Sequence, residues 1–471
     1  MRFVSVAWVF GAVWITATAG APIARFAKGL GASRFEFGVL AAIPFLAALL
    51  SLPSSLLVEH FGRRKRLFLA GLYSQRLLWL VLAPISLFVL HHSRPGHTGP
   101  ALMVFLALMF IQSAASSLGG VAWTSWMADI VPNRLRGRYF TRRRQLGILS
   151  AIPTACLVGW WLDHRVTPGD TAGMLSICAL IFTLSAVFGV ADIASFQFVP
   201  DIPLPRRPRA HLLATLGEPL RNRQFLLAVG FTATMMFALG FMGQFVTLYL
   251  IERVHATNFQ TQVMLLILPM IAQLLVLPIW GKAVDRMGKK PLLVLSGLAM
   301  VLPGLGWSFL TSHNIWFGYL VAGLGAAVYA GIETANQNLV YELSASSPDK
   351  SGAINPRAGS SYVAANTIIT SIATCLGGLA SGIVAQAMGD WHWHPTGALA
   401  FLAFKTYDYY DVLFVFSAIV RLAAVVIFLP KLHEPTARPA GEALRFMTAN
   451  VYSNLVGVVT TPFRLGARRG Q

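Results

Sequence analysis

The chain has 471 residues, of which 56% are hydrophobic and only 12% are charged. Soluble domains carry about a quarter charged residues, so this composition excludes an ordinary water-soluble domain. The formal net charge of +19 would suit a nucleic-acid-binding protein, but the basic residues lie in short loops between apolar segments, which excludes a continuous phosphate-binding face.

Twelve apolar segments are candidates for helices that cross a bilayer, and two of them, 225–251 and 315–343, clearly exceed the roughly 20 residues that this requires. Lipid offers the backbone no hydrogen-bond partners, so these segments must be helical. The N-terminal half holds six of them, at residues 5–27, 37–58, 67–90, 101–127, 146–162 and 174–198. The C-terminal half holds six more, at 225–251, 263–280, 291–310, 315–343, 361–388 and 409–429. The sequence therefore predicts an all-α membrane protein with twelve transmembrane helices.

The segments between and after the two halves differ in composition from the helices. Residues 200–224 are rich in Pro and Arg, as in a solvated linker. Residues 431–471 form a polar tail, within which 444–459 has the pattern of an amphipathic surface helix. We therefore predict an N-terminal six-helix bundle (1–199), a linker (200–224), a C-terminal six-helix bundle (225–430) and a cytoplasmic tail (431–471).

The basic residues indicate how the helices are oriented. With the N-terminus in the cytoplasm, 28 of the 37 Lys and Arg residues fall in inner segments and seven in outer loops. This asymmetry follows the positive-inside rule and places both termini of a cell-membrane protein in the cytoplasm. The first apolar segment also resembles a signal peptide, but its length, and the odd number of spans that cleavage would leave, favour a retained helix.

Two short loops carry the same motif. The first loop contains Glu59, Gly62, Arg63 and Arg64, and the second contains Asp285, Arg286, Gly288, Lys289 and Lys290. Aligning the two acids also aligns the two glycines, at a constant offset of 226 residues, which implies two homologous six-helix halves. Glycine permits a tight turn, an acid at a helix end suits the N-terminus of a neighbouring helix, and the basic run anchors the loop at the cytoplasmic face.

The G-x-x-x-D-(R/K)-x-G-(R/K)-(R/K) pattern of these loops resembles the signature cytoplasmic loop of the major facilitator superfamily. The second copy matches at every key position, whereas the first has Ser55 in place of the Gly and Glu59 in place of the Asp. The resemblance extends over residues 5–430 and implies a transporter whose two pseudo-symmetric bundles rock around a central site. It also implies that Glu59 and Asp285 act as gating residues, while a plain topology-setting loop is the alternative.

A fainter pair of loop motifs follows the fourth and tenth helices. Asp129 precedes Arg136 and Gly137 in the first, and Glu342 takes the corresponding place in the second. The resemblance implies that Asp129, Arg136 and Gly137 form a second cytoplasmic latch. Helix capping by the acids is the alternative interpretation.

Ionisable residues inside a membrane are costly, so each one is a candidate functional residue. Glu333 lies near the middle of the tenth helix, close to Asn336 and Gln337. Glu333 and Gln337 are four residues apart and share a helix face, and the resemblance places this helix at the central cavity. A carboxyl group shielded from water holds a proton more readily, which suits a proton carrier. A role in coupling or substrate binding and a structural interhelical hydrogen bond remain the two alternatives.

Further charges and amides lie inside the predicted helices. Arg76 and Arg421 fall on the third and twelfth helices, which the resemblance places outside the cavity, so a structural role is favoured. Asp192 of the sixth helix is a candidate partner of Arg76. Gln112 and Gln244, on the fourth and seventh helices, are candidate substrate contacts, with interhelical hydrogen bonding as the alternative.

The sequence indicates no cofactor and no metal site. All three cysteines lie inside apolar segments, which disfavours a disulfide framework or a thiolate site. Histidines cluster in two predicted outer loops, but without Cys or acidic partners at a fixed spacing they are better explained as interfacial residues. A Gly-rich phosphate loop is also missing, which disfavours a nucleotide as the energy source.

The sequence is best explained by a secondary transporter, working as a monomer in the lipid bilayer, that moves a small organic solute and is coupled to protons. It has neither the Gly-Pro-rich fifth-helix motif of drug/proton antiporters nor the Pro-Glu-Ser-Pro-Arg motif of sugar porters after the sixth helix. The scattered polar groups argue against a membrane-embedded enzyme. A transporter-like receptor or scaffold and a drug-efflux carrier remain the alternatives.

Overall fold

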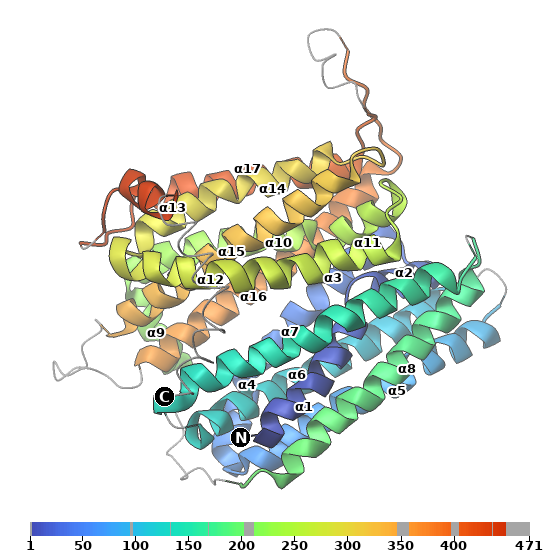
Figure 1. The fold of residues 1–471 in the computed structure, drawn as a ribbon, viewed down its shortest axis with the longest axis horizontal. Coiled ribbons are helices and arrows are strands. Elements are labelled where there is room, and N and C mark those ends of the chain that lie inside the picture. Colours follow the sequence, from blue (N-terminus) through green and yellow to red (C-terminus); the bar gives the residue numbers. More distant parts are fainter. Residues whose placement is uncertain are drawn as a thin grey trace, which may run out of the picture. The chain divides into compact units, whose positions relative to one another are not determined.

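The computed structural model describes residues 2–94, 98–131, 133–167, 169–201, 212–345, 358–396, 405–435 and 437–448. These residues are almost all helical (Figure 1). Among them, eleven helices are long and apolar enough to cross a membrane, and twelve if the bent pair Val6–Ala17 and Ala21–Gly29 counts as one span. The prediction of an all-α membrane protein is therefore confirmed.

The helices of the described N-terminal half coincide with the six apolar segments predicted there. They are α1 (Arg2–Ala17), α2 (Ala21–Gly29), α3 (Arg34–Ala48), α4 (Ser51–Phe61), α5 (Arg64–His92), α6 (Gly99–Ile130), α7 (Asn133–His164) and α8 (Thr171–Ser195). Two of the predicted spans are each made of a helix pair, α1 with α2 and α3 with α4. A short 3-10 turn, Phe196–Phe198, follows α8.

The helices of the described C-terminal half also cover their six predicted segments (Figure 1). They are α9 (Leu212–Arg221), α10 (Arg223–Glu252), α11 (Asn258–Gln262), α12 (Leu268–Met287), α13 (Lys289–Ala299), α14 (Val301–Gly306), α15 (Ile315–Ala345), α16 (Ala358–Met388) and α17 (Tyr409–Phe428). A π-helical turn, Val263–Ile267, joins α11 to α12. The expected linker thus contains a helix, α9. In the tail residues 440–448 are helical, and the rest of the expected surface helix lies outside the described residues.

The bend between α1 and α2 has a local cause. Gly20 adopts a φ of 73°, a conformation that few other residues tolerate. The Thr18 hydroxyl donates back to the Trp14 carbonyl at 2.9 Å, and Pro22 stands in the first turn of α2, where a missing N–H costs little. The two helices therefore meet at an angle of 41°. Together they are still long and apolar enough to form one membrane span.

The chain forms two compact units that do not follow the sequence halves. Unit 1 consists of Met1–Ala210, Gly240–Ile267 and Thr374–Tyr410, and unit 2 consists of His211–Leu239, Leu268–Ala373 and Asp411–Gln471. Unit 1 therefore combines the N-terminal half with α11, the end of α10 and the second part of α16. The domain boundaries expected from the sequence, at residues 199, 224 and 430, stay a prediction.

Close helix packing builds unit 1. A Cβ on Gly71 of α5 would lie 2.8 Å from the backbone nitrogen of Gly119 on α6, so glycine is what lets these two helices approach so closely. Phe68, Trp126 and Phe196 form an aromatic cluster, with ring centroids between 4.8 and 6.3 Å apart. These contacts fix α5 and α6 and the end of α8, and so position the helices that carry the candidate site.

Unit 2 has an apolar core of its own. Phe231, Trp280, Leu292 and Leu339, from α10, α12, α13 and α15, are all buried in it. The Trp280 indole also donates a hydrogen bond to the Ala327 carbonyl at 2.8 Å. Dispersion attraction between these interlocking side chains holds the four helices together.

Candidate functional site

Two buried charges of unit 1 form an ion pair inside the spanning helices. Arg76 of α5 and Asp192 of α8 are 4% and 3% exposed, and Arg76 Nη2 lies 3.5 Å from Asp192 Oδ2. Arg76 Nη1 also donates to Gln75 Oε1 at 2.7 Å. The structure thus provides the partner that the sequence suggested for Arg76. Taking two charges out of water is expensive, and their attraction offsets that cost only while both are present.

Three tryptophans contact the cations of this region. The guanidinium carbon of Arg76 lies 3.4 Å from the ring centre of Trp14. Arg143 of α7 contacts two indoles, at 3.9 Å from the ring centre of Trp8 and 4.8 Å from that of Trp123. Such cation–π contacts are stronger away from water than at a surface. Arg143 was not among the residues expected from the sequence, because it belongs to a basic run that is typical of a cytoplasmic loop.

Two glycines make room for the ion pair. A Cβ on Gly11 of α1 would lie 2.5 Å from Asp192 Oδ2, and a Cβ on Gly189 of α8 would lie 2.5 Å from Arg76 Cδ. Real Cβ atoms do not approach other atoms so closely. The absence of a side chain at these two positions therefore allows the charged groups to pack against the helix backbones.

Gln112 of α6 belongs to a hydrogen-bond network that continues from the ion pair. Its Oε1 accepts from Gln75 Nε2 and from Trp79 Nε1, both at 3.3 Å. Its Nε2 donates to Ser113 Oγ at 2.8 Å. Gln112 is buried, and both ends of its amide are used between α5 and α6. Of the two roles open for it, the contacts favour interhelical hydrogen bonding.

A cavity of about 250 Å³ lies beside the ion pair. Charged and aromatic side chains line it together, among them Trp8, Trp14, Arg76, Trp123, Arg143 and Asp192. Some buried polar atoms of this lining have no hydrogen-bond partner among the described residues, namely Trp14 Nε1, Arg76 Nε, Arg143 Nε and Asp192 Oδ1. Buried polar groups in proteins are nearly always paired, so such a concentration of unpaired atoms marks an unusual place in the fold.

The polar residues predicted on α15 do not act as one group. Asn336 is buried in unit 2 and accepts a hydrogen bond from the Thr232 hydroxyl of α10 at 2.8 Å. Glu333 and Gln337 are exposed, and they share another face of α15. Gln244 of α10 is half-buried and belongs to unit 1. The structure thus gives Asn336 an interhelical partner and leaves Glu333 and Gln337 accessible.

Arg421 of α17 is buried in unit 2 and binds the backbone of a neighbouring helix. Its Nη1 donates to the Met300 carbonyl at 2.8 Å. Met300 lies between α13 and α14, where the helix is interrupted and a carbonyl can accept from a side chain. A Cβ on Gly304 would lie 3.2 Å from Arg421 Nη1, so glycine leaves space for the guanidinium. These contacts fit the structural role expected for Arg421.

The first signature loop ties α5 to α6. Arg64 is buried, its Nη2 lies 2.6 Å from Asp129 Oδ2, and its Nη1 donates to the Ser125 carbonyl at 2.8 Å. Gly62 ends α4 with a φ of 63°, which explains the glycine at this turn. The side-chain positions of Glu59, Arg136 and Gly137 lie outside the described residues, and Arg63 is exposed.

An acid from the tail caps the helix that follows the second signature loop. Gly288, with a φ of 92°, precedes α13. Glu434 accepts from the backbone nitrogens of Lys289 and Lys290, at 3.0 and 2.7 Å, and so caps the N-terminus of α13. The helix dipole favours a carboxylate at this end. Nothing in the sequence pointed to this acid, because it lies 145 residues from Lys289, in the polar tail.

The motif's own acid in the second loop takes no part in that cap. Asp285 and Arg286 are exposed, and the Arg286 guanidinium carbon lies 5.4 Å from the ring centre of Phe446. Lys289 Nζ lies 2.5 Å from Glu342 Oε2, which ties α13 to α15. Each signature loop thus contributes a base that pairs with the acid of the second loop motif of its own half. Gating by these residues stays a prediction.

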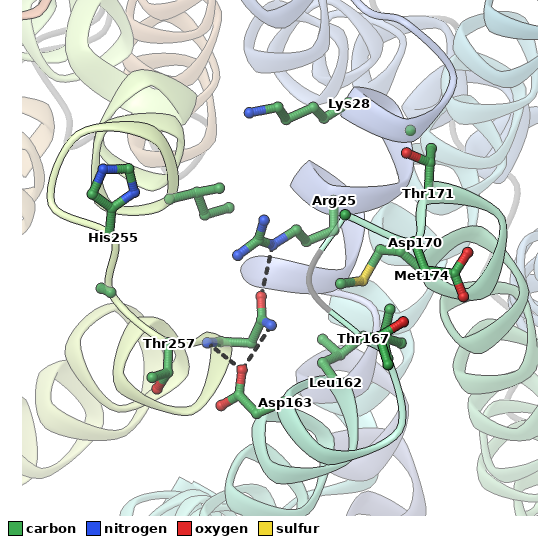
Figure 2. Close-up of a pocket in the computed structure, with 16 residues that line it drawn as sticks. Arg25, Lys28, Leu162, Asp163, Thr167, Asp170, Thr171, Met174, His255 and Thr257 are labelled. Atoms are coloured by element: carbon green, nitrogen blue, oxygen red, sulfur yellow. Dashed lines mark hydrogen bonds between the residues drawn. The ribbon is translucent and has the colours of Figure 1, made fainter.

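A larger pocket, of about 710 Å³, lies in unit 1 where α2, α7 and α8 approach α11. Asp163 of α7 accepts from the backbone and side-chain nitrogens of Asn258, both at 2.8 Å. Arg25 of α2 donates to the Asn258 side-chain oxygen at 2.8 Å, so Arg25 and Asp163, both labelled in Figure 2, bind the same side chain. Lys28 forms an ion pair with Glu252 at 2.7 Å. These contacts join the two sequence halves at their predicted outer loops, and sequence analysis singled out none of these residues.

A comparison with protein families gives one match over most of the chain. A sequence model described as Major Facilitator Superfamily matches residues 3–355. That range contains both signature loops and ten of the twelve predicted helices. A comparison with curated proteins gave no match.

Solved transporters have a similar fold. The nucleoside transporter NupG shares 12% sequence identity and a TM-score of 0.59, with 92% of this chain and 98% of that chain covered. The xylose transporter XylE from E. coli shares 14% identity and a TM-score of 0.59, with 93% and 99% covered. The E. coli fucose:proton symporter FucP shares 14% identity and a TM-score of 0.54, with 92% and 98% covered. At these identities the likeness concerns the fold and leaves the solute open.

Proposed function

The chain belongs to the Major Facilitator Superfamily, and from this premise we propose that it moves a small organic solute across the cell membrane by alternating access, coupled to protons. As a multi-pass member of that family it is a solute transporter. The proposal adds the coupling ion, the mechanism and a monomeric state. It also places both termini in the cytoplasm, because 28 of the 37 Lys and Arg residues then lie on the inner side.

The ion pair between Arg76 and Asp192 is the observation that carries proton coupling. An acid buried inside a spanning helix is costly and is a functional candidate by default. Asp192 has one oxygen near Arg76 and a second without a partner among the described residues, and both residues line a cavity. A proton bound by Asp192 would cancel its charge and release Arg76 from its counter-ion. Such a change gives a helix bundle two arrangements of different energy, which is what coupling requires.

Glu333 is the second candidate for the proton site. It is exposed on α15 together with Gln337, so a proton or a solute could reach it. Its accessible position contrasts with the buried position of Asp192. A neutral amide at either position keeps the size of the side chain and removes the titratable group, so the two candidates can be separated by experiment.

The contacts of the 710 Å³ pocket support alternating access. Asp163 and Arg25, from the N-terminal half, hold Asn258 of the C-terminal half. For the outer side to open, these hydrogen bonds must break, and each is worth about 1 kcal/mol in net terms. A few bonds of that strength lock a state without making it permanent. We propose that the pairs of Arg64 with Asp129 and of Lys289 with Glu342 act as latches at the inner side.

The test is solute flux in proteoliposomes with an imposed pH gradient. Sugars, amino acids, organic acids and lipophilic cations are screened first with the wild-type protein, and the lipophilic cations test for a drug-efflux carrier. The transported solute is then measured with Asp192→Asn and Glu333→Gln. Asp201→Asn is the matched control, because Asp201 is exposed and lies in the predicted linker, outside the spanning helices.

We expect flux that follows the pH gradient in the wild type and in Asp201→Asn, and flux that no longer responds to the gradient in Asp192→Asn. Loss of the response in Glu333→Gln alone would move the proton site to α15. Flux that ignores the gradient in every protein would refute proton coupling. The absence of flux for all solutes would favour the transporter-like receptor or scaffold.

A further inference from the structure

The cavity beside the ion pair carries more positive than negative charge. Arg76, Arg143 and Asp192 all line it, so two cations face one acid. Arg76 is paired with Asp192 at 3.5 Å, which leaves the charge of Arg143 as the excess. Arg143 is half-buried and has no ion pair of its own among the described residues, so a site of this kind favours an arriving anion.

Arg143 is held in a way that keeps its donors available. The ring faces of Trp8 and Trp123 contact its guanidinium, and Tyr139 and Asp192 interact with its charge at longer range. A guanidinium stacked on a ring uses the flat face of its own plane. Its hydrogen bonds to a carboxylate use the N–H groups at the edge of that plane. Two indoles therefore fix Arg143 without consuming the edge that binds an acceptor bidentately.

The walls of the cavity suit a small body with an apolar part. Phe68, Leu72 and Phe196 line it together with the indoles of Trp8 and Trp123. Its volume of about 250 Å³ equals that of about eight water molecules at ~30 Å³ each. A cavity of this size has room for one charged group and a short aliphatic or single-ring body.

We infer that this cavity binds the anionic group of a small organic monoanion, with Arg143 as its counter-charge. Asp192 sets the charge that is accepted, since it neutralises Arg76 and leaves a single positive charge for the solute. Trp8 and Trp123 position the guanidinium and contact the apolar body. Because this assignment names the class of solute, it rests on the proposed transport function.

The test compares acids with amides of the same shape. Thermal unfolding of the purified full-length protein is followed with benzoate against benzamide, and with propionate against propionamide. At least one acid is expected to raise the unfolding temperature in a concentration-dependent way, and its amide is not. The apparent affinity for that acid falls roughly tenfold or more in Arg143→Gln, because a charge-assisted pair is lost.

Two further variants keep the test decisive. Arg142→Gln removes the same charge from the preceding, exposed residue and is expected to bind the acid like the wild type. Arg143→Lys keeps the charge without the planar fork, and is expected to bind the acid more weakly than the wild type and more tightly than Arg143→Gln. If Arg143→Gln does not fold, the affinities of the wild type, Arg142→Gln and Arg143→Lys for the acid still test the inference.

Other results would overturn the inference. These are equal stabilisation by acid and amide, no stabilisation by either acid, or an unchanged affinity in Arg143→Lys and Arg143→Gln. The flux assay separates this failure from that of the proposed function. Gradient-driven flux of a neutral or cationic solute, without Arg143-dependent acid binding, would sink the anion site and leave proton-coupled transport standing. Arg143-dependent acid binding without flux of any solute would leave the anion site standing and contradict the proposed transport.

Discussion

The two units bury an arginine in different ways, and the difference separates a structural contact from a candidate functional one. In unit 1, Arg76 pairs with the carboxylate of Asp192 beside a cavity. In unit 2, Arg421 donates to the Met300 carbonyl between α13 and α14. The Met300 carbonyl has no proton to exchange, so it is not a titrating partner of Arg421. The pair in unit 1 can change its charge when Asp192 takes up a proton.

The two sequence halves also differ in the residues that they supply to this contact. Helix six of the N-terminal half supplies the acid Asp192, whereas helix twelve, its counterpart in the C-terminal half, supplies the base Arg421. Each half buries an ionisable residue at this contact, although the chemistry differs between them. The two homologous halves therefore share a scaffold and have diverged in the groups that carry charge inside it.

The largest effect is expected from breaking the ion pair. Arg76→Met leaves Asp192 buried without its counter-ion and should lower the free energy of unfolding by about 3 kcal/mol or more. The double variant Arg76→Met/Asp192→Leu removes both charges and should recover most of that loss. Unfolding is measured by titrating the detergent-solubilised protein with SDS. A double variant no more stable than the single one would show that the pair does not act as a pair.

The same substitution in unit 2 should cost less. Arg421→Met removes a donor from the Met300 carbonyl, which is a neutral acceptor. The expected loss is about 2 kcal/mol, as for a buried polar group that loses its partner. SDS titration of both arginine variants gives the comparison directly. If Arg421→Met cost more than Arg76→Met, the contrast between the units would have to be given up.

The room that glycine makes for the charges can be tested next. Gly11→Ala places a Cβ 2.5 Å from Asp192 Oδ2, and overpacking of this kind should cost about 1.5 kcal/mol. Gly281→Ala is the matched control, since a Cβ there meets no atom within 4 Å. The control should be neutral or slightly stabilising, because Ala is the better helix former. The shift in unfolding temperature measures both, and equal shifts would contradict the account.

The smallest effects are expected at the two signature loops. Glu434→Gln weakens the cap of α13 and should cost about 1 kcal/mol, typical of a helix cap. Asp129→Asn removes the partner of Arg64, but Asp129 is 51% exposed, so the cost should be about 0.5 kcal/mol or less. The unfolding temperatures of the two variants, measured at low and at high salt, give the comparison. A larger loss for Asp129→Asn than for Glu434→Gln would reverse the ranking.

The sequence by itself determined where the chain spans the membrane and to which family the chain is similar. A segment of about 20 apolar residues must be a helix in lipid, whatever its neighbours are, so the twelve predicted segments reappear as α1 to α8 and α10 to α17. The turn glycines Gly62 and Gly288 were found for a similar reason, because a positive φ at a tight turn is a local demand.

Only the tertiary structure decided which side chains meet. Arg143 reads as part of a basic loop and yet lies against Trp8 and Trp123, and Glu434 comes from the tail to cap α13. Asp192 was found as a partner of Arg76 because few charges occur inside the helices. Hydropathy is a property of neighbouring residues in the chain, whereas a binding partner depends on helices that pack together from distant parts of it. Spans could therefore be read from the sequence, and the candidate site could be read only in part.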